Sequence, residues 1–313
     1  KRRQRVIAAI ADRDAAKAEL DTAISDLDLA VSTAYFEAIR AKTELGLATN
    51  IKNNAANLLT AAKNQFQIGD APRSAVIRTE IELSRAEQAV SAAETDSANR
   101  QNTLYSLIGQ QDPGGLQYEL NATALPSVNL FSLESYALKQ RGDIKSAALG
   151  VVSKDAAYHS AKISGQPDLF LEGRHAQLNP VAGGTSLRVG LTLPLIDFGK
   201  NRADAATAKA EIKSQSALLE ETKRLALLDV RSAYAMYQQA KKLIESFEGQ
   251  RLSRSKELLE MAKIGYEKGA TSLLEYLDAQ QIYAMETTDY VRAISNLNIA
   301  AANLRHAVGG KLP

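Results

Sequence analysis

Two carboxylates in the last fifth of the chain are the clearest candidates for functional chemistry. Glu275 and Asp278 are three residues apart, so on a helix they lie on one face and present their acidic groups together. Glu275 also has a local structural explanation, because the segment "SLLE" that begins at Ser272 is a capping box in which Glu275 closes back on the start of its own helix. Asp278 has no such explanation, and we therefore rank it above Glu275.

No other group of residues indicates catalysis or a bound metal. The histidines His159, His175 and His306 are far apart in sequence and have no partner at metal-ligand spacing, and the chain contains no cysteine. We expect His159 and His306 on helix surfaces, and His175 on the polar face of a strand. The sequence predicts a protein that is not an enzyme, with no cofactor and no metal site.

The composition favours long helices over a compact globular core. Only 5% of the 313 residues are aromatic, tryptophan is absent and alanine is abundant. The formal charge of +2 comes without a sustained basic stripe, which argues against a nucleic-acid partner, and the basic opening "KRRQR" is interpreted as the end of a helix. No stretch reaches the roughly 18 apolar residues of a membrane-spanning helix.

An internal repeat organises the chain as two copies of one helical hairpin. The segment "VSTAYFEAIRAK" from Val31 matches "VRSAYAMYQQAK" from Val230, and "NLLTAAKNQFQIGDAP" around Leu59 matches "ELLEMAKIGYEKGATS" around Leu259. The offset between the copies is 199 residues for the first pair and 200 for the second, and it changes between positions 48 and 52. The second copy therefore holds one extra residue there.

Apolar or small residues recur in a four-three alternation in both copies. A repeat of 3.5 residues held this long predicts a left-handed coiled coil, and the alanines allow close helix approach. The first helix, from about Arg5 to Phe66, would be roughly 90 Å long. The two seams are Leu20, Ile24, Leu27, Val31, Ala34, Ala38, Ala41, Leu45, Ala48, Ala55, Leu59, Ala62 and Phe66, and Leu219, Ala226, Val230, Ala233, Tyr237, Ala240, Ile244, Phe247, Leu252, Leu259, Ala262 and Tyr266.

Each long helix should end at an exposed turn, from which a second helix returns over about residues 74–108 and 273–308. The fold class is thus mainly α. We expect two antiparallel coiled-coil hairpins (1–110 and 199–313), joined by an irregular and helical segment (111–166) and a β-hairpin (167–198). The two tips consist of Gly69, Asp70, Ala71 and Pro72, and of Gly269, Ala270, Thr271 and Ser272.

Residues 111–166 include the tripeptide "RGD" at Arg141 to Asp143. A cell-adhesion motif is one interpretation of it. A simpler explanation is a glycine that ends one helix, followed by an aspartate N-cap that starts the next. We expect a short helix, a break at Gly142 and a longer helix.

Within residues 185–200, the stretch 186–195 alternates strictly between apolar and polar types, which predicts a strand, and "PDLFLEGRHAQ" supplies its partner. Such a hairpin is not stable alone in water, so its apolar face must be covered. It could lie against lipid in a membrane barrel or pack as a small sheet on helices of a soluble protein, and the pattern alone favours neither. The apolar face is formed by Leu187, Val189, Leu191, Leu193 and Leu195.

Together these features resemble the TolC-like outer membrane factor family, the exit ducts of tripartite efflux pumps and type I secretion systems. The resemblance is carried by "GLTLPLIDFGKNRADAA" (190–206), "DVRSAYAMYQQA" (229–240), "AKIGYEKGATSLLEYLDAQ" (262–280) and "NLNIAAANLRHAVG" (296–309). In the family each repeat begins with a strand pair. Residues 1–5 align with residues 200–204, so the first strand pair and the helix before it are missing, and we expect a longer gene product.

The resemblance implies a homotrimer in the outer membrane of a Gram-negative envelope. Its helices would be staves of a periplasmic tunnel, and its β-hairpin would join a lipid-facing barrel. Both tips would dock a periplasmic adaptor protein, which connects the duct to an inner-membrane pump. Glu275 and Asp278 would form acidic rings at the periplasmic constriction. The first copy has Ala75 and Arg78 at the positions equivalent to Glu275 and Asp278, so we expect each protomer to contribute only one pair of acidic residues.

Two other hypotheses for the class of protein remain. A soluble coiled-coil scaffold would also contain long paired helices, with the strand pair as a minor addition. The adaptor protein itself has one helical hairpin flanked by β domains, and two hairpins around one ribbon fit it poorly. The sequence does not distinguish drug, metal or protein export.

Overall fold

The computed structural model describes all residues except 111–119, 123–124, 126–128, 178–182, 193–197 and 311–313. Its residues group into two compact units. The strand unit comprises Lys1–Ala23 and Leu138–Leu227, and the hairpin unit comprises Ile24–Ala137 and Leu228–Pro313.

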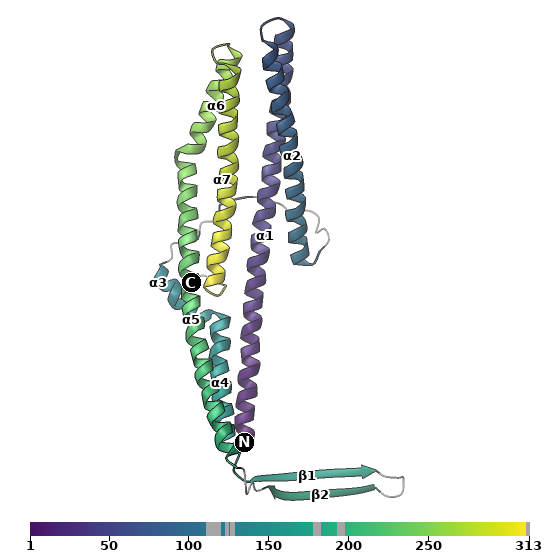
Figure 1. The fold of residues 1–313 in the computed structure, drawn as a ribbon, viewed down its shortest axis with the longest axis vertical. Helices are drawn as coiled ribbons and strands as arrows, with labels where there is room; N and C mark the ends of the chain where they lie inside the picture. Colours follow the sequence, from purple (N-terminus) through teal and green to yellow (C-terminus); the bar gives the residue numbers. More distant parts are fainter. Residues whose placement is uncertain (111–119, 123–124, 126–128, 178–182, 193–197, 311–313) are drawn as a thin grey trace. The chain divides into compact units, whose positions relative to one another are not determined.

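The hairpin unit contains the turns and the returning helices of the two helical hairpins that the repeat predicts, while the long helix of each hairpin begins in the strand unit (Figure 1). In the first hairpin, α1 (Arg2–Gln67) turns into α2 (Arg73–Ile108). In the second, α5 (Lys200–Ser246) continues into α6 (Leu252–Glu267), which turns into α7 (Leu273–Ala307). The predicted turns and returning helices are therefore confirmed, and so is the mainly α fold class.

A short π-helical segment, η1 (Phe247–Arg251), joins α5 to α6, whereas α1 is unbroken α-helix. The N–H of Leu252 donates to the carbonyl of Phe247, five residues back instead of four. This is where the second copy holds its extra residue, between the equivalents of Ala48 and Lys52. A π-bulge takes up one added residue within a turn, and the helix bends at this junction in Figure 1.

The main hydrophobic core of the hairpin unit joins the second hairpin to α3 (Leu130–Gln140). The N–H of Leu125 donates to the hydroxyl of Tyr237 at 2.9 Å, which binds the segment before α3 to α5. The first hairpin has a smaller buried cluster of Ala34, Ala38 and Leu104. The largest members of the main core are Leu125, Leu133, Val230, Tyr237, Ile244, Phe247, Ile294, Leu297, Leu304 and Val308.

The predicted coiled-coil seam is only partly covered within one chain. The buried members of the first seam include Ala34, Ala38, Ala41 and Ala62. In contrast, Leu20, Ile24 and Leu27 are 59%, 50% and 51% exposed. A single chain therefore leaves a stripe of branched apolar side chains in contact with solvent.

In the strand unit, α4 (Gly142–Lys162) contacts both long helices. The hydroxyl of Ser146 donates to Glu19 of α1 at 2.9 Å, and the ammonium of Lys154 donates to Glu211 of α5 at 3.0 Å. These contacts fix α4 to the parts of α1 and α5 that belong to the strand unit.

The predicted break between two helices is confirmed, but it lies at Arg141, and both the predicted glycine stop and the predicted aspartate N-cap are wrong, because Gly142 is the first residue of α4. The N-cap residue is Arg141, and Asp143 lies inside the first turn, where it accepts a hydrogen bond from the N–H of Ile144. Asp143 also pairs with the guanidinium of Arg141 at 2.7 Å. Burial alone would raise the pKa of Asp143, but its hydrogen bonds and the Arg141 charge lower that pKa below its usual value.

The predicted β-hairpin is present as an antiparallel pair, β1 (Asp168–Gln177) and β2 (Gly183–Thr192). Five of its apolar side chains share one face and are between 57% and 76% exposed, whereas Phe170 lies on the other face and is 42% exposed. The five are Leu169, Leu171, Leu187, Val189 and Leu191. Two further residues of the predicted apolar face, Leu193 and Leu195, lie outside the described residues.

The opposite face of the β-hairpin is polar, with Glu172 between Arg174 at 3.1 Å and Arg188 at 4.0 Å. The prediction that His175 lies on this face is wrong. His175 pairs with Thr185 and lies four residues beyond Leu171, which pairs with Val189. Because side chains an even number of residues apart on a strand point to the same side, His175 lies on the leucine face. Among the described residues, none of the helices is long and apolar enough to cross a membrane.

Candidate functional site: the helical tips and the cavity behind them

The two tips have the same backbone geometry. Gly69 and Gly269 have φ angles of +86° and +71°, in the left-handed region that favours glycine, and each ends its helix. The N–H of Asp70 donates to the carbonyl of Gln65 at 2.9 Å, and that of Ala270 donates to Gly265 at 2.7 Å. The predicted tip residues are all exposed or partly exposed, so both turns offer surface for a partner.

The tips differ in how the returning helix is capped. Ser272 forms the predicted capping box: its hydroxyl accepts from the N–H of Glu275 at 3.3 Å, and the Glu275 carboxylate accepts from the N–H of Ser272 at 2.9 Å. Pro72, at the equivalent place, makes no side-chain capping bond. The Glu275 carboxylate therefore has a structural role in the second tip that its counterpart in the first tip lacks.

A second difference is a close contact inside the second tip. The hydroxyl of Thr271 donates to the carbonyl of Ala262 at 3.3 Å, and it occupies the space where a Cβ on Gly265 would lie. The first copy has Gln65 and Ala71 at the places of Gly265 and Thr271. The glycine and the threonine therefore fit together as a pair. The difference between the two copies at these positions is the sequence signal for this pairing.

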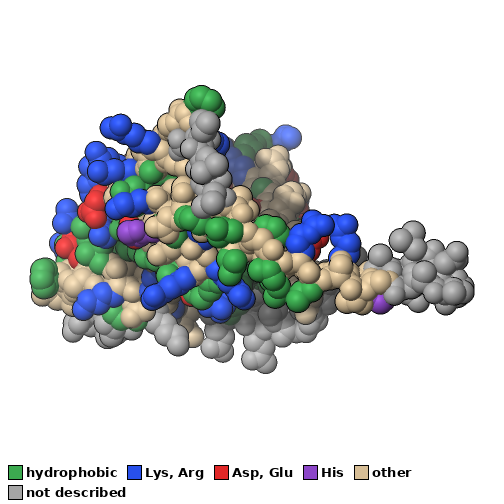
Figure 2. All heavy atoms as spheres, turned by 90° about the horizontal axis from the view of Figure 1, so that it is seen from below, with side chains coloured by type: hydrophobic (Ala, Val, Ile, Leu, Met, Phe, Trp, Pro, Cys, Tyr) green, Lys and Arg blue, Asp and Glu red, His purple; other side chains and the backbone are tan. Residues whose placement is uncertain are grey.

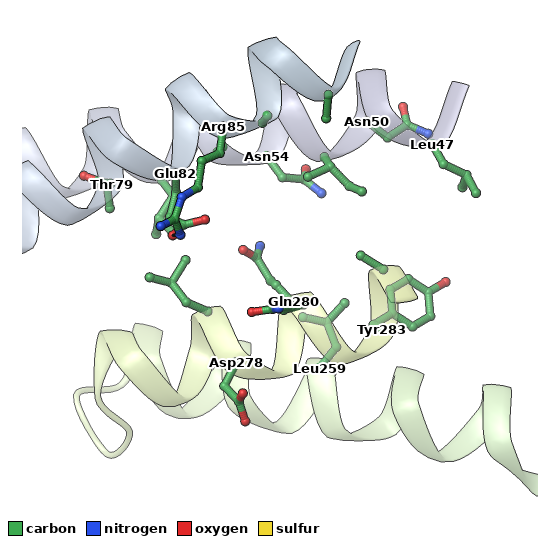
Figure 3. Close-up of a pocket in the computed structure, with 18 of the residues that line it drawn as sticks. Leu47, Asn50, Asn54, Thr79, Glu82, Arg85, Leu259, Asp278, Gln280 and Tyr283 are labelled. Carbon is green, nitrogen blue, oxygen red and sulfur yellow. Dashed lines mark hydrogen bonds and ion pairs between the residues drawn. The ribbon is translucent and has the colours of Figure 1, made fainter. Parts of the chain in front are cut away.

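Asp278 is exposed, and no hydrogen bond or ion pair to its carboxylate is found in the described part of the chain. It lies one turn beyond the capping box on α7. In Figure 3 its carboxylate points away from Glu82 and Arg85 of the first hairpin. An exposed carboxylate at this position is available to interact with ions or with a partner molecule.

A cavity of about 700 Å³ separates the two hairpins behind the tips (Figure 3). Its walls combine leucines with polar side chains, and Glu82 and Arg85 form an ion pair at 2.9 Å on the α2 side. Gln280 and Tyr283 face them from α7. The two hairpins are therefore not packed against each other at this level.

One side-chain bond nevertheless joins the hairpins near their tips. The hydroxyl of Tyr266 on α6 donates to the amide oxygen of Gln65 on α1 at 3.2 Å. The Tyr266 ring stacks on Tyr276 of α7, with centroids 5.5 Å apart and planes 9° apart, and Gln280 donates to the Tyr276 hydroxyl. Burial raises the pKa of both tyrosines. Sequence reasoning missed this contact, whose partners are 201 residues apart.

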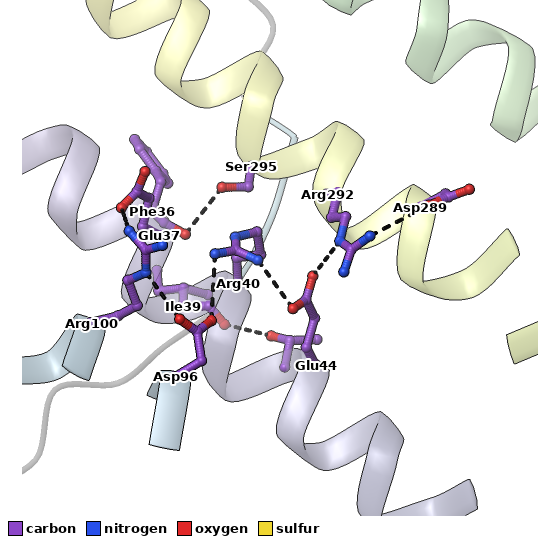
Figure 4. Close-up of polar contacts among 11 residues, drawn as sticks. Phe36, Glu37, Ile39, Arg40, Glu44, Asp96, Arg100, Asp289, Arg292 and Ser295 are labelled. Atoms are coloured by element: carbon purple, nitrogen blue, oxygen red, sulfur yellow. Dashed lines mark hydrogen bonds and ion pairs between the residues drawn. The ribbon is translucent and has the colours of Figure 1, made fainter. Parts of the chain in front are cut away.

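Farther from the tips, an ion-pair network joins α2, α1 and α7 (Figure 4). Glu44 accepts from Arg40 at 3.1 Å on one side and from Arg292 of α7 at 2.9 Å on the other. Arg40 also pairs with Asp96 of α2 at 3.7 Å. The hydroxyl of Ser295 donates to the carbonyl of Phe36 at 3.2 Å. These contacts hold the second hairpin to the first at a level where Glu44 is only 15% exposed.

The same stretch of α7 also contacts η1. Arg251 pairs with Glu286 at 2.9 Å, and Tyr290 donates to Glu248 at 3.3 Å. The Arg251 guanidinium also lies 4.3 Å from the centroid of the Phe247 ring. α7 is therefore bound to α1 and to the π-bulge over nearly the same residues.

The histidines do not come together. His159 lies near Asp155 at 3.5 Å, His306 near Asp26 at 2.6 Å, and His175 hydrogen bonds to Thr185 at 2.9 Å. Within the described ranges, there is no group of three or more His, Cys, Asp or Glu residues that could hold a metal ion.

Duplicated long hairpins around one strand pair with an exposed apolar face define a mainly α protein that carries a single amphipathic β-hairpin in the part of the chain that the structure describes. A family model described as outer membrane efflux protein matches residues 1–110 and 133–310. The chain belongs to this family, whose members reside in the outer membrane of Gram-negative envelopes.

Two curated relatives illustrate the membership. The outer membrane protein OprJ of Pseudomonas aeruginosa is 26% identical over 274 residues, which cover 80% of this chain and 56% of OprJ. The cation efflux system protein CusC of Escherichia coli is 25% identical over 287 residues, covering 86% of this chain and 62% of CusC. The chain thus spans about three fifths of the length of these relatives.

Solved structures share the fold. A structure of CusC matches with a TM-score of 0.83 at 18% identity, over 99% of this chain and 74% of that one. The open state of the MtrE outer membrane channel of Neisseria gonorrhoeae matches with a TM-score of 0.81 at 23% identity, over 98% and 71%. At these identities the match supports the fold.

Proposed function

We propose that the complete protein is the outer-membrane exit duct of a tripartite efflux pump, a passive conduit without catalysis or cofactor. It would be a homotrimer that receives cargo from an inner-membrane pump through a periplasmic adaptor. The observation that carries this proposal is the uncovered apolar stripe on both long helices. Its exposed members on α5 are Leu218, Leu225 and Leu228, and those on α1 are Leu20, Ile24 and Leu27.

The apolar stripe needs partners that a single chain does not supply. Branched side chains about half exposed at heptad spacing are the pattern of helices that pack against further helices. Copies of the same chain, arranged as staves, would cover both stripes at once and enclose a tunnel. A closed ring of identical subunits is also the usual form of a homo-oligomer.

The β-hairpin supports a membrane position. One face carries five exposed apolar residues, and the other carries the Glu172, Arg174 and Arg188 charges. Two strands with such faces become stable when their edges pair in a closed barrel, apolar side out. We assign Leu187, Val189 and Leu191 to the lipid and extend that assignment to Leu193 and Leu195 by alternation.

At the periplasmic mouth we assign the constriction to Asp278 first and to Glu275 second. Asp278 has a free carboxylate, whereas the Glu275 carboxylate is engaged in the capping box. Three protomers would bring three Asp278 carboxylates together, and such a ring favours cations. Docking of the adaptor is assigned to the exposed tips, Gly69 to Pro72 and Gly269 to Ser272.

We further propose that the second hairpin opens the mouth by bending at η1. The ion pair of Glu44 with Arg292 and the contacts of Arg251 and Tyr290 would hold α7 at that level. Between this level and the tip, the cavity gives the second hairpin room to move, and the Tyr266–Gln65 bond would latch the closed state.

The test is single-channel conductance of the complete trimer in a planar lipid bilayer. Wild type should give small, cation-selective currents, and Asp278→Asn should raise the current or reduce the selectivity. Glu275→Gln is the matched control, since glutamine can still close the capping box, and it should change the current less. Folded, trimeric protein that inserts but never conducts would contradict the duct.

A further inference from the structure

We propose that a basic collar at the base of the β-hairpin binds the phosphate headgroups of anionic phospholipids at the periplasmic surface of the outer membrane. This inference rests on the proposed membrane position of β1 and β2. The collar consists of Lys1, Arg2, Arg3, Arg5, Lys162, Lys200 and Arg202. All of these residues belong to the strand unit.

Three helix ends bring the collar to the base of the hairpin. The ammonium of Lys1 donates to the carbonyl of Gln166 at 2.8 Å and to Asp168, the first residue of β1, at 2.6 Å. The hydroxyl of Ser164, just after α4, donates to Asn201 in the first turn of α5 at 2.8 Å. The start of α1, the end of α4 and the start of α5 are therefore tied to the point where the strands begin.

The collar has more positive charge than its surroundings neutralise. Asp168 pairs with Lys1, and Asp204 pairs with Lys200 at 2.8 Å. The remaining five side chains are exposed and have no ion pair in the part of the chain that the structure describes. Figure 2, which looks at the end where the strands lie in Figure 1, shows Lys and Arg side chains among hydrophobic ones and few acidic ones.

Helix stability does not explain the basic residues at the starts of α1 and α5, whereas Lys162 lies in the last turn of α4, where a positive charge is favourable. The first turn of a helix favours acidic side chains, and neither α1 nor α5 has one there. Basic residues recur at equivalent positions of both copies: Lys1 corresponds to Lys200, and Arg3 to Arg202. The same unfavourable arrangement in two copies indicates a negative partner outside the chain.

Lipid phosphate fits this surface better than a soluble anion because the collar continues into apolar surface. Leu169 and Leu191 form the second residue pair from the base of the hairpin and are 76% and 57% exposed. Basic side chains beside an exposed apolar face match the boundary between headgroups and acyl chains.

The experiment compares the complete trimer in lipid nanodiscs of phosphatidylcholine alone and with phosphatidylglycerol added. The readouts are the melting temperature and the phosphatidylglycerol retained after detergent extraction. Wild type should melt higher with phosphatidylglycerol and retain it. The combined variant Arg2→Gln, Arg3→Gln, Arg202→Gln should lose both effects.

The matched control neutralises three exposed basic residues of α6, Arg254→Gln, Lys256→Gln and Lys263→Gln, and should behave as wild type. A collar variant that keeps the lipid effects overturns the proposal. So does inorganic phosphate that stabilises lipid-free protein to the same extent through the same arginines. Protein that inserts and conducts without lipid preference refutes the collar alone, whereas protein that does not insert refutes the duct as well.

Discussion

The two hairpins share one repeated sequence, yet they differ at the tip and along the long helix, where we propose that the second hairpin bends. The first hairpin has an uninterrupted α1, a turn without a side-chain cap, and Arg78 beyond it. The second has a π-bulge, a capping box, and Asp278 in the place of Arg78. A common repeat therefore fixes the architecture, while one inserted residue and a few tip residues give the copies different mechanical and electrostatic properties.

The strongest test of this difference is removal of the extra residue. Deleting Gly249 should convert η1 into α-helix as in α1, because the copies then have equal length. We expect the second tip to lose its mobility and the channel to stay at its lowest conductance. The 313 residues contain no cysteine, so spin labels at Ile68→Cys and Lys268→Cys can report the distance between the tips.

The control for this deletion is Gly249→Ala, which keeps the residue count and should keep the bulge. Wild type and this control should show a broad or divided distance distribution, and the deletion variant a single narrow one. Equal distance distributions in all three proteins would contradict the proposal that η1 is the hinge.

The unequal cores provide a second test, with a matched pair of leucines. Leu104 and Leu304 are equivalent in the repeat, and both are fully buried, at 2% and 0% exposure. Leu304→Ala should cost about 4 kcal/mol, because it empties space in the large core, and Leu104→Ala about 2 kcal/mol in its small cluster. The comparison of melting temperatures checks the order, and equal shifts would show that the clusters contribute alike.

A smaller effect is expected for the glycine that accommodates Thr271. Gly265→Ala should destabilise the second tip by about 1–3 kcal/mol, because its Cβ overlaps the Thr271 hydroxyl. The double variant Gly265→Ala, Thr271→Ala should recover most of that loss, since the first tip already has a side chain beside Ala71. Hydrogen exchange at the tip amides measures both, and strictly additive effects would argue against direct coupling.

The smallest effect concerns pH. The pKa values of Tyr266 and Tyr276 are raised above the ordinary 10.0 by burial, so their neutral forms are favoured in the folded tip. Their contribution to stability is complete below pH 10.0 and is lost as the pH rises through the raised values. Exchange of the second tip should therefore increase in strong alkali. The variant Tyr266→Phe, Tyr276→Phe should lack this pH dependence, and an unchanged profile would refute it.

Much of the fold could be predicted because its causes are local. The glycine turns, the capping box of Ser272 with Glu275 and the strand alternation are all properties of neighbouring residues. Local predictions were wrong at two places. His175 lies on the apolar face of its strand, not the polar one, and Asp143 lies in the first turn of α4, not at the N-cap. Local reasoning also missed the pairing of Gly265 with Thr271, although the repeat displayed it.

The sequence by itself determined the repeat, the length of the helices, the extra residue and the side-chain types at each tip. Only the tertiary structure decided that the extra residue becomes a π-bulge, and which distant groups meet. Glu44 and Arg292 are 248 residues apart, and Tyr266 and Gln65 are 201 apart. Periodicity specifies which face of a helix is buried, but the partner that a charged or hydroxyl group meets depends on how the helices are placed side by side.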